Sequence, residues 1–126
     1  MDEELYNKGM EVRRKVLGDK HIARRQESPD RFTQQQNELV TELAWGKIWS
    51  RPQLPLKLRS LVTIAMLAAL NRADELKGHV NGALNNGATP EEIVEVFIQG
   101  AAYLGFPASN TCVRLAVEVF RERGLV

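Results

Sequence analysis

Hydrophobic residues recur at helical spacing from the start of the chain. A first helix is predicted in the opening segment, where the apolar positions are Leu5, Met10, Val12, Val16 and Leu17. Gly18 stands where a glycine would end this helix. The following stretch, Asp19 to Pro29, is polar and is expected to be a loop.

A second and a third helix flank a break that contains two prolines. Ser28-Pro29-Asp30 offers a helix start, and the helix continues to near Trp49 through Phe32, Leu39, Leu43 and Trp45. Pro52 and Pro55 cannot both lie inside a helix. The third helix is predicted over Leu56 to Asn71 and is apolar on most of its surface, which is typical of a helix buried on several sides.

The second half of the chain carries strong helix-capping signals. Asp74 is a possible cap for a fourth helix, which ends at Asn85-Asn86-Gly87. Thr89-Pro90-Glu91-Glu92 predicts a capping box for a fifth helix ending near Leu104. A last amphipathic helix is predicted from Ala108 to Arg123. Because no alternating strand pattern is found, the expected fold is all-α, with six helices in one domain over residues 1–126.

Composition narrows the class of protein. Seventeen Lys and Arg against sixteen Asp and Glu give a net charge of +1, which argues against a nucleic-acid partner. The local excess of basic residues in the first third is interpreted as a solvated helix face and its following loop; it comprises Arg13, Arg14, Lys15, Lys20, Arg24 and Arg25.

The same composition suggests a cytoplasmic protein. Cys112 is the one cysteine and has no partner for a disulfide within the chain. No secretory signal is recognised, and the apolar run Leu61 to Leu70 is too short to span a membrane. Short helices leave much surface exposed in a monomer, so a homo-oligomer is expected to cover part of a set of large aromatics: Trp45, Trp49, Phe97, Tyr103 and Phe106.

Long segments resemble the γ-carboxymuconolactone decarboxylases. They are GMEVRRKVLG (9–18), AWGKIWSRP (44–52), RSLVTIAML (59–67), ELKGH (75–79), NNGATPEEI (85–93) and YLGFPA (103–108). The resemblance implies a subunit of the alkylhydroperoxidase-D-like superfamily, usually assembled into hexameric rings. It also implies decarboxylation of 4-carboxymuconolactone to 3-oxoadipate enol-lactone, in protocatechuate breakdown, without metal or organic cofactor.

Peroxidase chemistry of the same superfamily is not expected here. Members with that activity carry Cys-x-x-Cys-x-x-x-His, whereas the corresponding positions before His79 are Arg72 and Glu75. Those members also carry a glutamate on the preceding helix, where this chain has Ser60.

His79 is the first candidate for the catalytic acid. Glu75 lies one turn earlier and could orient the imidazole and favour its protonated form. The structural alternative is a histidine that packs or hydrogen-bonds between helices. Glu42, if buried and protonated, is the second candidate for the proton donor.

A dianionic substrate needs cations and an apolar wall. The candidate cations are Arg51, Arg59 and Arg72, which can grip a carboxylate with two hydrogen bonds. Trp45, Trp49 or Leu67 could form the wall beside the departing carboxylate, and polar contacts are expected from Asn85, Asn86 and Tyr103. Each of these residues also has an ordinary structural interpretation, in the core, at a salt bridge or at a helix end.

Two other functions remain open at this level. The same scaffold could act on another carboxylated lactone or keto acid, because pocket shape decides the substrate. The resemblance to the usual decarboxylases is least secure in the segment Asn110 to Arg114, and if that last helix lines the site, substrate identity is put in doubt. A non-catalytic helical oligomer is the second possibility; an enzyme should instead place His79 and an arginine around a cavity.

Overall fold

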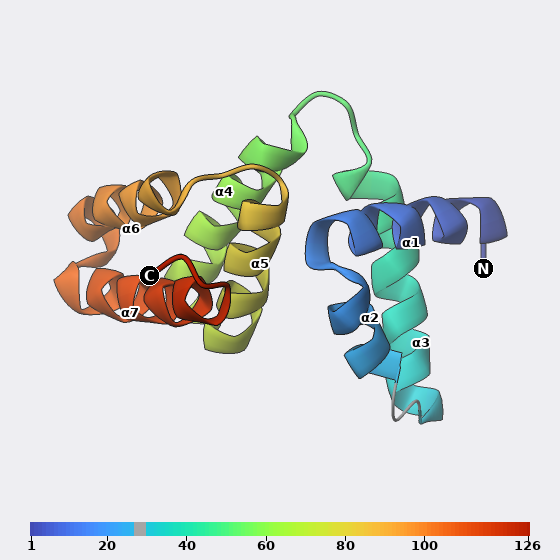
Figure 1. The fold of residues 1–126 in the computed structure, drawn as a ribbon. Helices are drawn as coiled ribbons and strands as arrows, with labels where there is room; N and C mark the ends of the chain where they lie inside the picture. The colour runs from blue at the N-terminus through green and yellow to red at the C-terminus, as the bar shows by residue number, and fades with distance from the viewer. Residues whose placement is uncertain (27–29) are drawn as a thin grey trace. The chain divides into compact units, whose positions relative to one another are not determined.

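The computed structural model describes residues 1–26 and 30–126, and every regular element in these residues is a helix (Figure 1). In chain order they are α1 (Glu3–Leu17), α2 (Asp19–Gln26), α3 (Arg31–Leu39), the π-helix η1 (Val40–Trp49), α4 (Leu56–Ala69), α5 (Ala73–Asn85), α6 (Pro90–Leu104) and α7 (Phe106–Glu122). The all-α class is therefore confirmed. The chain forms two compact units, Met1–Leu56 and Lys57–Val126, and the expectation of a single domain stays a prediction. None of the described helices is long and apolar enough to cross a membrane.

The first departure from the expected elements is α2. The segment from Asp19 was predicted to be a loop, but it is helical to Gln26. Gly18 ends α1 with a φ of 91°, a conformation that suits glycine and lets the chain turn at once into the next helix. Ile22, the one large apolar residue of α2, is 4% exposed. Packing of this single side chain, together with Asp19 in the first turn, stabilises α2. The helix was not predicted because its sequence is mostly polar.

The second predicted helix is two kinds of helix in succession. Ser28 and Pro29 lie outside the described residues, while Asp30 is the N-cap of α3 and accepts hydrogen bonds from the backbone of Phe32 and Thr33. The hydrogen bond from the Thr33 backbone lowers the pKa of Asp30. After Leu39 the helix widens into η1, which ends at Trp49; the predicted end is confirmed, while the change to a π-helix was not predicted.

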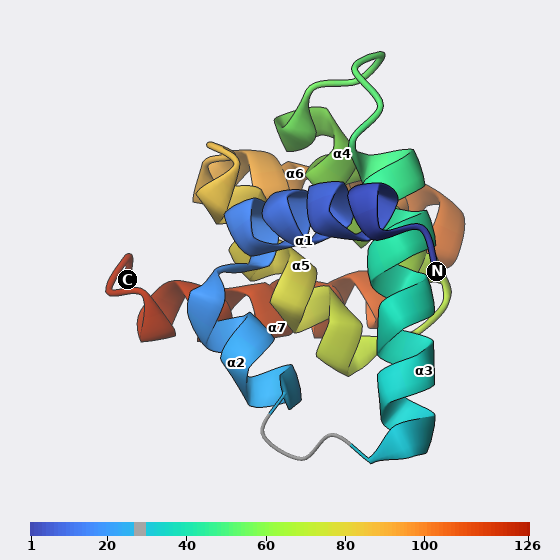
Figure 2. The same ribbon diagram turned by 90° about the vertical axis from the view of Figure 1, so that its right-hand side faces the viewer.

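Two glycines allow α1 and η1 to cross in close contact. A side chain at Gly9 would overlap the carbonyl oxygen of Thr41, and one at Gly46 would overlap the carbonyl oxygen of Leu5. Figures 1 and 2 both show α1 lying across the continuous α3–η1 helix. The core of this unit is small and centres on Val16, Leu17 and Trp45.

Arg13 is buried in the same contact, so its interpretation as part of a solvated face is wrong. The side chain is 5% exposed, and its Nη1 donates hydrogen bonds to Asn37 Oδ1 at 2.7 Å and Thr41 Oγ1 at 2.8 Å. Thr41, also fully buried, donates in turn to the carbonyl oxygen of Asn37. Arg13 lies between Gly9 and Val16 on the face of α1 that meets η1, and this position, more than its charge, decides its burial.

The second unit packs α4, α5, α6 and α7 around one apolar cluster. Its fully buried members include Ile64, Val80, Ile93, Phe97 and Ala116. Helices α6 and α7 lie side by side in both ribbon views. Thr89 and Glu92 form the predicted capping box of α6.

Other boundaries in this unit shift by a few residues. Helix α5 has Arg72 as its N-cap instead of Asp74, which lies in the first turn. The last helix begins at Phe106, two residues before the predicted start, because Pro107 fits the first turn of a helix.

Helix α4 is less buried than the sequence predicted. It was predicted to be buried on several sides, but in this chain it buries one face, formed by Ser60, Ile64 and Ala68. Four large apolar residues on another face are 43% to 67% exposed: Leu58, Val62, Met66 and Leu70. The apolar composition of α4 therefore exceeds what the core of its own unit uses.

The contact between α1 and η1 makes a first prediction. Replacing Gly9 with Ala should lower the free energy of unfolding by about 3 kcal/mol, because backbone must move to admit one methyl group. Gly100→Ala is the matched control, since a Cβ there meets only Leu104 Cδ1 at 3.6 Å. Urea unfolding followed by circular dichroism measures both. Equal stability of the two variants would contradict the close contact.

The buried guanidinium makes a second prediction. Arg13→Met should destabilise the protein by about 2 kcal/mol, since Asn37 and Thr41 lose a charged hydrogen-bond donor. The neighbouring Arg14→Met should change stability by less than about 0.5 kcal/mol, because Arg14 is exposed and its ion pair with Asp19 is long, 3.8 Å. Thermal unfolding of the two variants compares them directly, and similar losses would refute the structural role of Arg13.

Candidate active site

The predicted site residues are divided between the two units. Glu42, Trp45, Trp49 and Arg51 belong to Met1–Leu56, and Arg59, Arg72, Glu75, His79, Asn85 and Tyr103 belong to Lys57–Val126. Each group is described within its own unit.

In the first unit, η1 carries three of the candidates. Trp45 is 4% exposed, and its ring stacks on that of Trp49 with a centroid distance of 4.7 Å and an interplanar angle of 23°. Trp45 therefore belongs to the core of this unit, and Trp49 is the partly exposed member of the stack. π-Helical turns within helices occur frequently at functional sites, and η1 extends over ten residues.

Glu42 and Arg51 lie at opposite ends of this helix. Glu42 is half-buried, and its Oε1 accepts a hydrogen bond of 3.2 Å from the backbone nitrogen of Asp2, just before α1. Arg51 is exposed in the segment after η1, where its backbone nitrogen donates to the carbonyl oxygen of Ile48. Glu42 therefore has a structural partner at the start of α1, and its catalytic role stays a prediction.

In the second unit, α5 carries the predicted acid. His79 is half-buried in the middle of this helix, and its Nδ1 atom is buried. Glu75 lies one turn earlier on the same side of the helix and is exposed. The two residues thus have the predicted helical relation, with the imidazole in the less solvated position.

The arginines of this unit have different surroundings. Arg59 is half-buried on α4 and its Nε is buried, whereas Arg72 is exposed at the turn between α4 and α5. Asn71 in this turn has a φ of 59°, which asparagine tolerates better than most residues. The turn leaves Arg72 at the N-cap, just outside the helix that carries His79.

Asn85 and Tyr103 lie away from the central turns of α5. Arg123 donates hydrogen bonds of 2.7 Å to the Oδ1 atoms of both Asn81 and Asn85, which joins the end of α7 to α5. Tyr103 is 81% exposed near the end of α6. Asn85 is thus part of an interhelical contact, and a substrate contact for either residue stays a prediction.

A polar pair that sequence analysis did not predict joins α4 to the end of α5. Asn86 Nδ2 donates to the Oγ of the buried Ser60 at 2.9 Å. Asn86 follows His79 by seven residues, two helical turns, so both project from the same side of α5. The seven-residue spacing of His79 and Asn86 can be read from the sequence. The pairing of Asn86 was not predicted because Asn85-Asn86-Gly87 was interpreted as a helix end.

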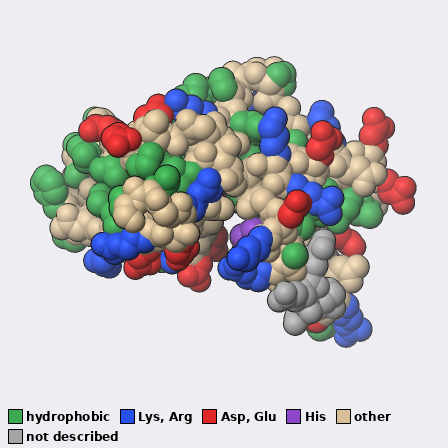
Figure 3. All heavy atoms as spheres, in the orientation of Figure 1, with side chains coloured by type: hydrophobic (Ala, Val, Ile, Leu, Met, Phe, Trp, Pro, Cys, Tyr) green, Lys and Arg blue, Asp and Glu red, His purple; other side chains and the backbone are tan. Residues whose placement is uncertain are grey.

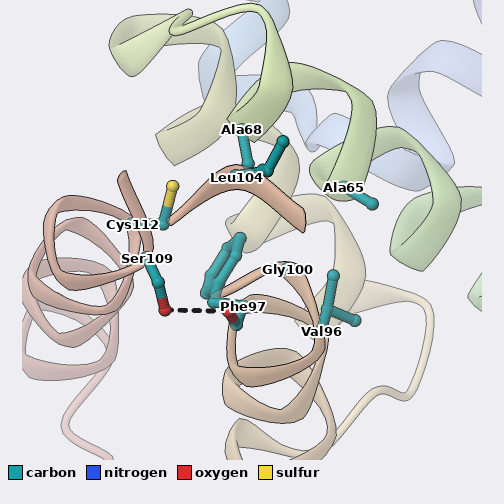
Figure 4. A pocket seen from close by; sticks show the side chains of 8 residues that line it. All are labelled: Ala65, Ala68, Val96, Phe97, Gly100, Leu104, Ser109 and Cys112. Atoms are coloured by element: carbon teal, nitrogen blue, oxygen red, sulfur yellow. Dashed lines mark hydrogen bonds between the residues drawn. The ribbon is translucent and has the colours of Figure 1, made fainter. Parts of the chain in front are cut away.

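The second unit also contains two hollows between its helices. A groove of about 650 Å³ runs between α4 and α6, and its walls include Leu61, Ala65, Ala69, Gly100 and Tyr103. A cavity of about 30 Å³ continues from the same region toward α7, reaching Phe97, Ser109 and Cys112. Figure 4 shows these side chains around the cavity, with the Ser109 hydroxyl donating to the carbonyl oxygen of Phe97. The cavity has room for about one water molecule.

The charge of the groove is unsuited to a dianionic substrate. The ionisable side chains in its walls, apart from Tyr103, are Glu92 and Glu95. Lys57, beside it, is paired with Glu92 at 2.8 Å, and the hydrogen bond from Lys57 lowers the pKa of Glu92. Two carboxylates at the groove would repel a dicarboxylate, so its chemistry differs from that of the arginine and histidine candidates.

Metal binding by clustered side chains is not indicated in the part of the chain that the structure describes. Residues 1–26 and 30–126 contain no group of three or more His, Cys, Asp or Glu side chains that could hold a metal ion.

Comparison with known proteins gives a consistent set of relatives. The model of the carboxymuconolactone decarboxylase family matches residues 36–118. A 4-carboxymuconolactone decarboxylase from Acinetobacter baylyi is 46% identical over 124 residues, which cover 98% of this chain and 92% of that protein. A nitrosuccinic acid decarboxylase from Metarhizium robertsii is 39% identical over 82% of this chain and 73% of its own length. A 15.0 kDa protein from Paracoccus denitrificans, of uncharacterised function, is 34% identical over 66% of this chain and 63% of its own length.

The burial of Cys112 makes a third prediction. Burial raises the pKa of the Cys112 thiol, and the side chain is 5% exposed, so little reactive thiolate is accessible at neutral pH. Native protein should react with iodoacetamide at least about 100-fold more slowly than urea-unfolded protein. Asn110→Cys, which adds a thiol to an exposed position of α7, should react rapidly in the native state. Fast labelling of native Cys112, measured by mass spectrometry, would contradict this environment.

Proposed function

Since the chain belongs to the carboxymuconolactone decarboxylase family, we propose that it converts 4-carboxymuconolactone to 3-oxoadipate enol-lactone and carbon dioxide, a step of protocatechuate catabolism. The observation that carries the proposal is the 46% identity with a protein of that name over nearly the whole of both chains. An identity of this level over nearly the whole of both chains supports a shared fold.

The chemistry of this substrate explains what the protein must supply. The bond between a ring carbon and its carboxylate breaks, and the electron pair flows through the ring double bond to the lactone carbonyl oxygen. The resulting dienolate takes a proton on the carbon next to that carbonyl, which gives the enol-lactone. The substrate therefore contains its own electron sink. The protein must hold a dianion, stabilise charge on the lactone oxygen and deliver one proton.

We assign the proton delivery to His79. A half-buried imidazole can be protonated near neutral pH and can both stabilise the dienolate and donate to carbon. Its place on a well-packed helix supports the assignment, since the neighbouring Leu76 and Val80 are anchored in the core. Glu75 is proposed to orient the imidazole, and Glu42 is the second candidate for the acid.

Substrate binding is proposed to depend first on Arg59. A guanidinium with a buried Nε acts in a lower dielectric than the exposed Arg51 and Arg72, so its attraction for a carboxylate is stronger. It should hold the acetate arm, since a cation on the departing carboxylate would stabilise the ground state. Trp49, which stacks on the buried Trp45 and is partly exposed, is proposed as the apolar wall for the departing group.

A second candidate substrate follows from the relative named nitrosuccinic acid decarboxylase. Nitrosuccinic acid is also a dicarboxylic acid, and its electron-withdrawing nitro group would favour loss of the carboxyl on the same carbon. The two reactions share the loss of carbon dioxide into a built-in electron sink. A small dicarboxylate of this type is therefore the proposed alternative to the lactone.

The remaining proposals concern assembly and location. We propose that the functional form is a homo-oligomer, and the family resemblance implies a hexamer. A cytoplasmic location is proposed from the single cysteine and the metabolic role.

The fourth prediction tests the reaction and its acid together. Purified protein should release carbon dioxide from enzymatically generated 4-carboxymuconolactone, and His79→Gln should lower kcat about 100-fold or more because the general acid is lost. His21→Gln is the matched control, since His21 is also half-buried but lies on α2 and has no proposed role. Circular dichroism confirms that both variants are folded.

Each outcome of this experiment has a defined meaning. Full activity of His79→Gln would remove His79 as the acid and direct attention to Glu42→Gln. Absence of turnover by the folded parent would refute the proposed substrate, and turnover of nitrosuccinic acid instead would select the alternative.

A further inference from the structure

Helix α5 and the turn after it contain two asparagines that are each followed by a glycine. Asn81-Gly82 lies in the middle of the helix, and Asn86-Gly87 lies at its end. Asparagine loses its side-chain amide most easily before glycine, because a glycine has no side chain to hinder attack by its backbone nitrogen on the asparagine Cγ. The local sequence treats the two pairs alike, so any difference between them comes from the fold.

The first pair is held against α7. Arg123 Nη1 donates to the Oδ1 of Asn81 at 2.7 Å and to its backbone carbonyl oxygen at 3.3 Å, and Gly82 is buried. One turn before Asn81, Lys77 forms an ion pair of 3.1 Å with Glu118 of α7. Acidic and basic side chains gather over α7 on the face that Figure 3 draws. Attack at Asn81 therefore requires the interior of α5 to unfold and to separate from α7.

The second pair lies where α5 ends. Asn86 is the C-cap, with φ −86° and ψ 9°, and the exposed Gly87 has a φ of 92°. Two backbone hydrogen bonds close this turn, from Gly87 to the carbonyl oxygen of Leu84 at 3.1 Å and from Ala88 to that of Ala83 at 2.9 Å. A helix end of this kind opens with much less free energy than the interior of a packed helix.

Ser60 restrains the side chain of Asn86 in the closed turn. Asn86 Nδ2 donates to the Oγ of Ser60 at 2.9 Å, and Ser60 is fully buried on α4. Nδ2 is the atom that deamidation would release as ammonia. The Gly87 nitrogen, which would attack, donates at the same time to Leu84. The leaving group and the nucleophile are therefore both held while the turn is closed.

We propose that Asn86, and not Asn81, is a deamidation site of the folded protein, and that its hydrogen bond to Ser60 limits the rate. When the turn opens, the Gly87 nitrogen attacks Asn86 Cγ; a nitrogen–carbon bond forms, and the amide proton passes to solvent hydroxide. The Cγ–Nδ2 bond then breaks, and ammonia leaves with a proton from water. Solvent water opens the resulting succinimide ring at either carbonyl and gives aspartate or isoaspartate. One water is consumed and one ammonia is released, without oxidation or reduction.

The product changes both the charge and the backbone at the end of α5. Aspartate places a negative charge at the C-terminal end of a helix, where the helix dipole disfavours it. Isoaspartate adds one carbon to the main chain inside the turn that the Ala88–Ala83 hydrogen bond closes. The preceding residue, Asn85, accepts a hydrogen bond from Arg123 at 2.7 Å, so loosening of the turn also weakens the contact with α7. The reaction needs only solvent water and is independent of the proposed decarboxylation.

The fifth prediction compares the two asparagines within one protein. During incubation in mildly alkaline buffer, Asn86 of the native protein should deamidate at least about 10-fold faster than Asn81, because only the helix end must open. In urea the two should react at similar rates, since both precede glycine. Digestion at acidic pH followed by fragmentation in a mass spectrometer assigns the modified position. Equal rates in the native protein, or conversion of Asn86 only after unfolding, would overturn the proposal.

Two serine variants test the restraint. Ser60→Ala should raise the rate at Asn86 by about 5-fold, the factor that corresponds to the loss of one ordinary hydrogen bond. Ser109→Ala is the matched control, because Ser109 is also a buried serine of this unit but donates to the carbonyl oxygen of Phe97. It should leave the rate at Asn86 unchanged. An unchanged rate in Ser60→Ala, or the same increase in both variants, would contradict the role of Ser60.

Thermal unfolding measures the consequence. Protein aged until Asn86 is converted should unfold at a lower temperature than fresh protein. Asn86→Gln keeps a side-chain amide but would have to form a larger ring, so this variant should show neither the modification at position 86 nor the loss of stability on ageing. A stability loss of the same size in aged Asn86→Gln would assign the damage to another residue and refute the proposed consequence.

Discussion

The contact of α1 with η1 through Gly9 and Gly46 is the constraint on which the first unit depends. Each glycine meets a backbone carbonyl of the opposite helix, so the two helices approach more closely than side chains would allow. At this distance the Arg13 side chain lies between them and reaches Asn37 and Thr41. A buried charge costs several kcal/mol in lost hydration, and well-formed hydrogen bonds offset that cost only when the geometry is fixed. The glycines fix it.

The same contact accounts for the helix that carries Trp45 and Trp49. Thr41 and Trp45 are buried against α1, while Leu39 and Leu43 of the same continuous helix are about half exposed. Thr41 and Trp45, four residues apart, would share a side of a regular α-helix as well, whereas Gly46 comes to that side through the wider turns of η1. The wider turn of η1 changes which residues face α1, and Thr41 bonds back to the carbonyl of Asn37 just before the wider turns. The tryptophan stack is therefore a result of tertiary packing as well as of sequence.

Local signals predicted the parts of the fold that are decided locally. Thr89, Pro90 and Glu92 specify the start of α6, and Gly18 specifies the end of α1. Helix α2 was missed because its stability depends on one buried residue, Ile22, and on packing that its polar sequence does not reveal. Arg13 was misinterpreted because charge was given more weight than its position between Gly9 and Val16.

For the candidate site, the sequence predicted which residues to consider but not which of their side chains lie together. The resemblance to a known family identified His79 and the arginines as candidates, but helical spacing alone cannot say which side chains converge. The Ser60–Asn86 pair joins residues 26 positions apart, and such a contact is set by the packing of α4 near α5. Arg123, which joins Asn81 and Asn85, is likewise specified by the end of α7 and not by the neighbouring sequence.

Different sides of helix α4 carry different kinds of residue: one side is apolar, and another carries Arg59 and Ser60. The face with Leu58, Val62 and Met66 adjoins a groove bordered by Glu92 and Glu95, which suits apolar protein surface and repels a dianion. Arg59 and the buried Ser60 lie elsewhere around the helix, with Ser60 bonded to the end of α5, the helix of His79.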